Sequence, residues 1–328
     1  MTALSLRRDL VTGRRVLVAP ARRGSPRDFG AIPLARDASQ CPFCPGHESA
    51  TSETRAERVD RETGAWIARA FSNLFPMVHP DATTGAFERP TEGALAARGD
   101  HEVLVETPSH DVDLGELSDD HARAVFDLYR ERYRVLANRD DARAMLLFKN
   151  RGPRAGASLR HAHGQVLSVP IVPPGVRRRD AISRKRYEAF GKGALAELRD
   201  RELDAGVRMV ERTARFAVFC PFAPHRSFET WIVPMTPVAS LAQIDDEALD
   251  ELAPLIVRTV KRVRCATGDA DYNLVLRAPA LRHWGAPWAL WNLEVLPRRG
   301  GDAGFELSTE MQCVLTPPEE SAQVLRAL

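Results

Sequence analysis

Apolar residues along the chain follow the spacings that mark helices and strands. Residues 101–108 ("HEVLVETP") form a short apolar run typical of a strand, and residues 117–141 repeat apolar positions at helical spacing after Ser118, which favours a helix N-terminus. Residues 143–152 ("RAMLLFKNRG") and 163–170 ("HGQVLSVP") are predicted to be the next two strands. The helix is predicted to have these residues on its apolar side: Val125, Phe126, Leu128, Tyr129, Val135 and Leu136.

The same order of elements returns in the second part of the chain. Residues 228–234 predict a strand, residues 244–268 a helix, and residues 271–279 and 291–298 two further strands. The repeated order indicates an internal duplication. Helices packed on largely antiparallel strands predict an α+β fold. The second helix is predicted to place four apolar residues on one stripe: Leu249, Leu252, Ile256 and Val263.

Composition narrows the classes of function. Of the 328 residues 44% are hydrophobic, and 46 Lys and Arg against 44 Asp and Glu give a net charge of +2. This balance argues against a nucleic acid or an anionic membrane as partner. The basic run at residues 177–186 has no interleaved aromatic residues, so we predict a solvated helix face there. The sequence near the N-terminus has no long apolar segment and the five cysteines form no regular framework, which predicts a cytoplasmic protein.

The segment "CPFC" suggests a metal site. Cys41 and Cys44 could bind one Zn²⁺, but a structural site needs two more ligands. Histidines are expected to complete it, with His161 and His110 as first choices and His47 as the third. A redox dithiol is the alternative, although that motif lies between a strand and a helix rather than in a loop. The remaining cysteines stand alone in apolar segments and are predicted to be buried thiols: Cys220, Cys265 and Cys313.

Two histidines one residue apart, His161 and His163, are the strongest candidates for chemistry. On an extended strand they project to the same side, so one could bind the metal while the other faces a substrate. A neutral imidazole can attack phosphorus when one ring nitrogen donates to a carbonyl and the other keeps its lone pair. Gly164 would let the backbone approach a phosphate, and Gln165 could donate an amide hydrogen to it. The alternatives are that both histidines bind zinc, or that one is a core histidine.

The chain resembles the galactose-1-phosphate uridylyltransferase family in six segments that follow the same order over nearly its whole length: "CPFC", "FSNLFP", "FKNRGPRAGASLRHAHGQV", "RELDAGVRMVERTARFAVFCPF", "SFETWIVP" and "GFELSTEMQ". This family is the transferase branch of the histidine-triad superfamily. The resemblance implies an α+β fold of two tandem histidine-triad-like halves, with helices packed on mainly antiparallel sheets. We expect the first half, with zinc site and nucleophile, at residues 1–190, and the second, without the histidine motif, at residues 191–328.

The resemblance also implies roles for individual residues. His163 would attack UDP-hexose and form a covalent nucleotidyl-histidine, which then passes UMP to a hexose 1-phosphate. Gln165 and Ser158 would contact the phosphates, and one structural zinc would be held by Cys41, Cys44, His110 and His161. The implied partners are a nucleotide sugar and a sugar phosphate, and the family's assembly allows a homodimer. Further substrate-binding residues match the family at these positions: Arg22, Phe71, Asn73, Phe75, Asn150, Gly156, Glu306 and Gln312.

The sequence departs from the family's pattern at several positions. Ala162 stands where proline is common between the two histidines, and Leu74 stands where the uridylyltransferases tend to have an acidic residue. The second departure leaves an ADP-glucose phosphorylase of the same fold as an alternative function. A catalytically silent, zinc-containing nucleotide-binding protein is a further alternative. No second metal is predicted, because the positions that hold it in some family members are occupied by Arg179, Trp284, Leu290 and Asn292.

Overall fold

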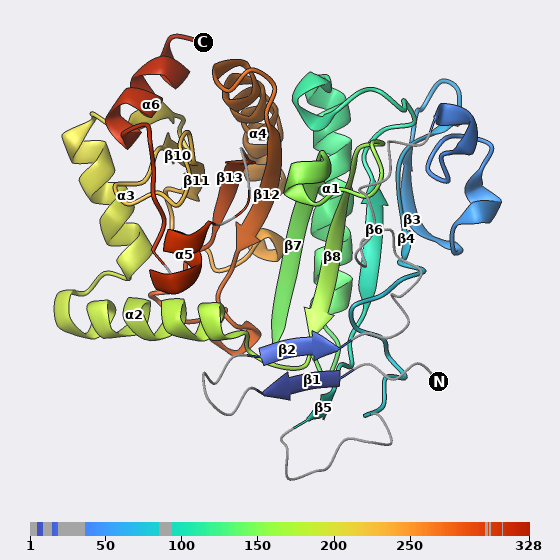
Figure 1. Ribbon diagram of the computed structural model, residues 1–328, viewed down its shortest axis with the longest axis horizontal. Helices are drawn as coiled ribbons and strands as arrows, with labels where there is room; N and C mark the ends of the chain where they lie inside the picture. The colour runs from blue at the N-terminus through green and yellow to red at the C-terminus, as the bar shows by residue number, and fades with distance from the viewer. Residues whose placement is uncertain are drawn as a thin grey trace.

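A single ten-stranded sheet, antiparallel throughout, forms the centre of the molecule (Figure 1). The computed structural model describes residues 5–8, 15–18, 37–84, 94–298, 301, 303–309 and 311–328. In sheet order the strands are β3 (Thr54–Val59), β4 (Trp66–Ser72), β6 (His101–Val105), β8 (His163–Val169), β7 (Ala144–Arg151), β12 (Asp271–Arg277), β13 (Asn292–Arg298), β11 (Thr230–Pro234), β10 (Phe216–Phe219) and β9 (Met209–Arg212).

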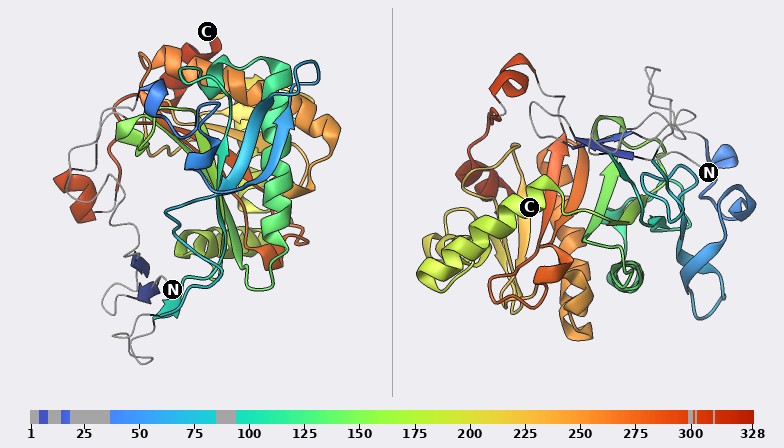
Figure 2. Two further views of the ribbon diagram at one scale, coloured as in Figure 1. Left: turned by 90° about the vertical axis from the view of Figure 1, so that its right-hand side faces the viewer. Right: turned by 90° about the horizontal axis from the view of Figure 1, so that it is seen from below.

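Helices cover the two faces of this sheet unequally. Helices α1 (Asp119–Ala137) and α4 (Asp246–Ala266) pack together on one face and bury the main core between themselves and the strands (Figures 1 and 2). On the opposite face, α2 (Pro174–Phe190) and α3 (Ala194–Ala205) lie over the second half only. None of the described helices is long and apolar enough to cross a membrane. The remaining α-helices and strands are α5 (Gly304–Thr309), α6 (Pro318–Arg326) and a small sheet of β1 (Ser5–Arg8), β2 (Arg15–Val18) and β5 (Leu95–Ala96).

The strand order is that of two equivalent halves joined at the centre. Read outward from the middle, β7, β8, β6, β4 and β3 correspond to β12, β13, β11, β10 and β9. Phe148 pairs with Gln165 of β8, and Val275 pairs with Glu294 of β13, so these two pairs are equivalent. Phe148 and Val275 also face each other across the central β7–β12 pairing. The fold is therefore α+β with two tandem histidine-triad-like halves, as predicted, although both halves share one continuous sheet.

Most of the predicted elements are confirmed. Ser118 caps α1, because its side chain accepts a hydrogen bond from the His121 backbone N–H. The prediction was wrong for Val135, which is 49% exposed, because it lies about 100° around the helix from the buried Leu136. The four predicted core residues of α4 are all buried. Among the three isolated cysteines the prediction holds for Cys220 and was wrong for the two exposed ones, Cys265 and Cys313.

Candidate functional site

Four predicted ligands come together beside the start of β8. The Sγ atom of Cys44 lies 3.4 Å from His110 Nδ1 and 3.5 Å from His161 Nδ1, and the Sγ atom of Cys41 lies 3.6 Å from His161 Nδ1. The four ligand atoms all lie within 4.8 Å of one another and could hold a metal ion. In a tetrahedral zinc site a sulfur and a nitrogen ligand are separated by about 3.5 Å, so the donor set fits this ion.

Hydrogen bonding and burial around the cluster determine which protonation states of its side chains are favoured. His161 Nε2 donates to the Thr107 carbonyl at 2.7 Å, which leaves Nδ1 as the ligand atom. Burial lowers the pKa of His161 and so favours the neutral, metal-binding imidazole. Burial, together with neighbouring Cys41, raises the pKa of Cys44 to about 11, so its thiolate requires the positive charge of an ion. His47, the third-choice ligand, lies outside the cluster, and its Nδ1 is 2.7 Å from the Cys41 carbonyl oxygen.

His163 has a different environment from His161. It is the first residue of β8, and it is 7% exposed whereas His161 is fully buried. Its Nδ1 lies 2.8 Å from the His161 carbonyl oxygen, which can only accept, so Nδ1 carries the proton and the lone pair is on Nε2. The ring packs edge-on against Phe43 at 5.1 Å between centroids. The four-residue cluster does not include His163, so the alternative in which both histidines bind one ion does not match this structure.

Gln165 lies on the same side of β8 as His163 and is bound to a histidine that the sequence analysis did not consider. Its Oε1 lies 2.8 Å from His101 Nε2, and the backbone N–H of Met77 donates to His101 Nδ1 at 3.0 Å. Asn73 follows β4 next to this ring, with its Nδ2 atom 3.2 Å from His101 Nε2. The segment around Asn73 and the Gln165 side chain are thus joined through one buried imidazole.

The glycine-rich loop before the histidines is attached to the centre of the sheet. Asn273 of β12 donates from Nδ2 to Asn150 Oδ1 and to the Ala155 carbonyl, both at 2.8 Å. At Gly152, where φ is +81°, a Cβ atom would lie 1.9 Å from Asp271 Oδ1. Gly156 is also in a left-handed conformation, with φ of +96°. Asn150, in β7, and Gly156, in the loop, therefore lie in a backbone that the second half holds in place, and Ser158 is two residues after Gly156.

The other predicted substrate residues have diverse positions. Phe71 is buried against Phe43, with 5.6 Å between ring centroids, whereas Phe75 is 45% exposed. Glu306 lies on α5, which stands away from the sheet in the edge-on view of Figure 2. The Oε1 atom of Gln312 is buried and has no hydrogen-bond partner among the described residues. Arg22 lies outside the part of the chain that the structure describes.

A buried ionic network beneath β8 was missed from sequence. Lys149 is 1% exposed, and its Nζ lies 2.8 Å from Glu106 Oε2 and 3.0 Å from Asp113 Oδ1. Tyr129 donates to Glu106 Oε1 at 2.9 Å. A Cβ atom on Gly164 would lie 1.8 Å from the Tyr129 hydroxyl oxygen, so this glycine makes room for a helix side chain rather than for a phosphate. Lys149 in the apolar run "AMLLFKN" could have indicated this network, because a lysine is rarely buried without a charged partner.

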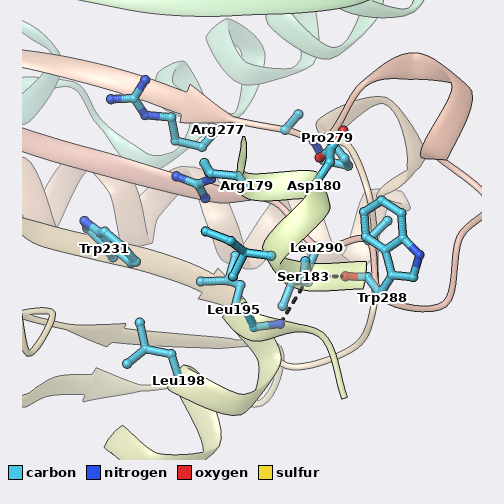
Figure 3. Close-up of a pocket in the computed structure, with 14 residues that line it drawn as sticks. Arg179, Asp180, Ser183, Leu195, Leu198, Trp231, Arg277, Pro279, Trp288 and Leu290 are labelled. Atoms are coloured by element: carbon cyan, nitrogen blue, oxygen red, sulfur yellow. Dashed lines mark hydrogen bonds between the residues drawn. The ribbon is translucent and has the colours of Figure 1, made fainter. Parts of the chain in front are cut away.

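The equivalent position in the second half holds other residues. Asn292 and Glu294 replace His163 and Gln165, and Arg179 of α2 donates to Asn292 Oδ1 at 2.6 Å and pairs with Glu294 at 3.2 Å. Arg277 pairs with Glu294 at 2.9 Å. Figure 3 shows both arginines at the edge of a cavity of about 230 Å³, with Trp231 beside them. The cations here are already bound to a carboxylate, so this half has paired charges where the first half has the imidazole of His163.

Comparisons with known proteins agree with this arrangement. An ADP-glucose phosphorylase from Arabidopsis thaliana is 29% identical over 330 residues, which cover 98% of this chain and 92% of that protein. A galactose-1-phosphate uridylyltransferase from Thermotoga maritima is 26% identical over 98% of both chains. The crystal structure of an ADP-glucose phosphorylase from Arabidopsis thaliana with bound ADP-glucose matches with a TM-score of 0.78 at 28% identity, over 98% of both chains. The family model described as galactose-1-phosphate uridyl transferase, N-terminal domain, matches residues 4–173, and the chain therefore belongs to this family of nucleotidyltransferases.

Proposed function

We propose that the protein transfers a nucleotidyl group from a nucleoside diphosphate sugar to a phosphate-bearing acceptor through a covalent intermediate on His163. The observation that carries this proposal is the hydrogen bond from His163 Nδ1 to the His161 carbonyl, because it puts the lone pair on Nε2. Nε2 attacks the α-phosphorus and forms a P–N bond. The bond from phosphorus to the bridging oxygen breaks, and the sugar 1-phosphate leaves with the electron pair.

The same hydrogen bond stabilises the intermediate. Once Nε2 is bonded to phosphorus the ring is a cation, and an Nδ1–H donor on a cation binds a carbonyl oxygen more strongly than a neutral ring does. In the second step an acceptor phosphate oxygen attacks the same phosphorus, and the P–N electron pair returns to Nε2. Gln165 is on the correct side of β8 to donate to a non-bridging oxygen in both steps.

We propose zinc as the ion of the Cys41, Cys44, His110 and His161 cluster, with a structural role. Four protein ligands fill a tetrahedral site, which leaves no position for substrate. The cluster would fix the backbone at His161, and the carbonyl of this residue is the acceptor for His163. The metal therefore supports the nucleophile's orientation and takes no part in the bond changes.

ADP-glucose is our first candidate for the donor, ahead of the UDP-hexose expected from the sequence. The Arabidopsis thaliana ADP-glucose phosphorylase is similar over nearly the whole chain, and Leu74 replaces the acidic residue that is frequent in the uridylyltransferases. UDP-hexose stays the second candidate because of the likeness to the Thermotoga maritima uridylyltransferase. The acceptor is inorganic phosphate in the first case and a hexose 1-phosphate in the second, for which Gln312 is the supporting residue, since its Oε1 has no partner in the described chain.

The test is to incubate the protein with ADP-glucose or UDP-glucose without acceptor and to measure its intact mass. We expect an added nucleotidyl group, more with ADP-glucose, that disappears in His163→Ala. His225→Ala is the matched control, because this exposed histidine lies in the second half. An adduct that persists in His163→Ala excludes the proposed nucleophile. Tight nucleotide binding without any adduct would instead identify a catalytically silent binding protein.

A further inference from the structure

His101 connects two parts of the site that are distant in sequence. It is the first residue of β6 and is only 3% exposed. Its ring contacts Gln165 of β8 on one side and the segment after β4 on the other, where it accepts from Met77. The backbone of His101 takes part as well, because its carbonyl accepts from the Asn73 N–H at 2.8 Å.

The partners of His101 determine where its proton is. A backbone N–H can only donate, so Nδ1, which receives the Met77 N–H, must carry a lone pair. In a neutral imidazole the proton is then on Nε2. Of the two atoms near Nε2, Gln165 Oε1 at 2.8 Å can accept this proton, whereas Asn73 Nδ2 at 3.2 Å is itself a donor and makes only a close contact. The amide carbonyl of Gln165 is therefore turned toward His101.

This orientation decides what Gln165 can offer to a ligand. A glutamine amide has an acceptor end and a donor end, and rotation by 180° exchanges them at little steric cost. With Oε1 bound to His101, the NH₂ group is the end left for other partners. Gln165 is partly exposed on the same side of β8 as His163, so its donor can face the phosphate that His163 attacks. The opposite orientation would direct an oxygen lone pair at a phosphate oxygen.

We propose that His101 is a positioning residue, which holds the Gln165 amide with its N–H groups toward the phosphate and couples this orientation to the segment at Asn73–Met77. This inference rests on the proposed function. Asn73 Oδ1 accepts from the Phe75 N–H at 2.8 Å, so the asparagine that flanks the ring is itself held in one orientation. The position of the Asn73–Met77 segment and the orientation of the phosphate donor are thereby linked through one ring.

The experiment is a double-mutant cycle on the rate of adduct formation at saturating ADP-glucose, with wild type, His101→Phe, Gln165→Ala and the double variant. Gln165→Ala removes the amide donor and is expected to slow adduct formation by roughly 10²-fold. His101→Phe is expected to slow it by about 10-fold, because the amide then samples both orientations, and to have no further effect in the Gln165→Ala background. His101→Gln keeps an N–H donor and is expected to recover part of the rate.

Two outcomes would overturn the inference. One is an unchanged rate in His101→Phe. The other is an equal slowing in the presence and absence of Gln165, since a residue that only supports the fold would act independently of the amide. Thermal unfolding and metal content check that each variant is folded. If wild type forms no adduct, the proposed function fails on its own, and the same cycle is then measured on the Kd for ADP-glucose.

Discussion

The two halves of the sheet place different side chains between helix and strands at equivalent positions. Tyr129 and Ile256 each lie eleven residues after the N-cap of their helix, Ser118 in α1 and Asp245 in α4. In the first half Tyr129 donates to Glu106, which also pairs with Lys149, and the Tyr129 hydroxyl lies against Gly164. Where the first half pairs Lys149 with Gly164, the second half pairs two leucines, Leu276 and Leu293. One half therefore has an ionic layer and the other an aliphatic one.

The ionic layer lies directly beneath the residues that we assign to chemistry. Gly164 separates His163 from Gln165 on β8, and its missing side chain is what admits the Tyr129 hydroxyl. A buried ion pair seldom adds stability over apolar side chains of similar size, because removing the charges from water costs several kcal/mol. The half with His163 thus retains a costly but directional arrangement, whereas the other half is packed by non-directional contacts. We attribute this difference to the need to hold β8 in one position.

The largest effect is expected from exchanging the residues at the two equivalent strand starts. His163→Asn copies the second half and should reduce nucleotidyl transfer by roughly 10⁴-fold or more, because the covalent route is lost. Asn292→His, the reverse exchange, should give no second adduct, since Arg179 and Arg277 occupy its surroundings. Intact mass after incubation with ADP-glucose measures both. Two adducts per chain in Asn292→His would show that the halves are chemically interchangeable.

Among the described residues, a cluster of possible metal ligands is found in the first half only. Cys41→Ser should lower zinc content and thermal stability together, because structural zinc contributes on the order of 10 kcal/mol to the folding of small zinc domains. Cys220→Ser is the control, as it changes a buried thiol of the second half that is not in the cluster. Elemental analysis and a thermal melt are the measurements. Full zinc content in Cys41→Ser would contradict the ligand assignment.

Replacing Lys149 tests the comparison between the ionic layer of the first half and the aliphatic layer of the second. Lys149→Leu leaves Glu106 and Asp113 buried without their cation and should reduce the free energy of unfolding by roughly 3–5 kcal/mol. Adding Glu106→Gln should restore part of this loss. Denaturant unfolding measures both variants. Wild-type stability in Lys149→Leu would mean that the first half tolerates an aliphatic layer as well as the second does.

A methyl group on β8 should disturb the first half specifically. Gly164→Ala places a carbon where the Tyr129 hydroxyl lies and should cost about 1–3 kcal/mol of unfolding free energy, as other overpacked core substitutions do. Tyr129→Phe in the same background should relieve part of the clash. The matched change in the second half, Leu293→Ala, removes atoms instead of adding them. Equal stability of wild type and Gly164→Ala would show that this glycine is not required for packing.

The smallest effect is expected in the pH dependence of the free energy of unfolding, to which the ionic layer contributes in acid. Burial alone would raise the pKa of Asp113, but Lys149 and several hydrogen bonds lower it to about 2. A carboxyl whose pKa is lower in the folded state stabilises above its unfolded pKa, near 3.8, and the stabilisation of up to about 2 kcal/mol is lost as the pH falls toward 2. Glu106 has the opposite sign, since burial raises its pKa. Unfolding at a series of pH values should show a shallower slope in Asp113→Asn, and identical slopes would refute the assignment.

The sequence predicted the parts of the structure that depend on local pattern. The N-cap at Ser118 and the cysteine and histidine ligands follow from residue type and spacing, and the resemblance added the order of the motifs. The roles of Gly164 and His101 could not be found in this way. Each depends on a contact with a residue far along the chain, Tyr129 for the glycine and Gln165 for the histidine. Periodicity identifies which face a residue is on, but it does not identify the partner across a sheet.

The pairing of β7 with β12 has a consequence for any attempt to divide the protein. Phe148 and Val275 meet at the axis that relates the halves, so the backbone groups of β7 that face β12 would be left open in a fragment ending at residue 190. In a second copy of the fragment, β7 could take the place of β12 and pair antiparallel with β7 of the first copy about the same axis. Truncation at the middle of this chain would thus be expected to give a symmetric pair of fragments with two copies of His163, rather than an isolated monomer.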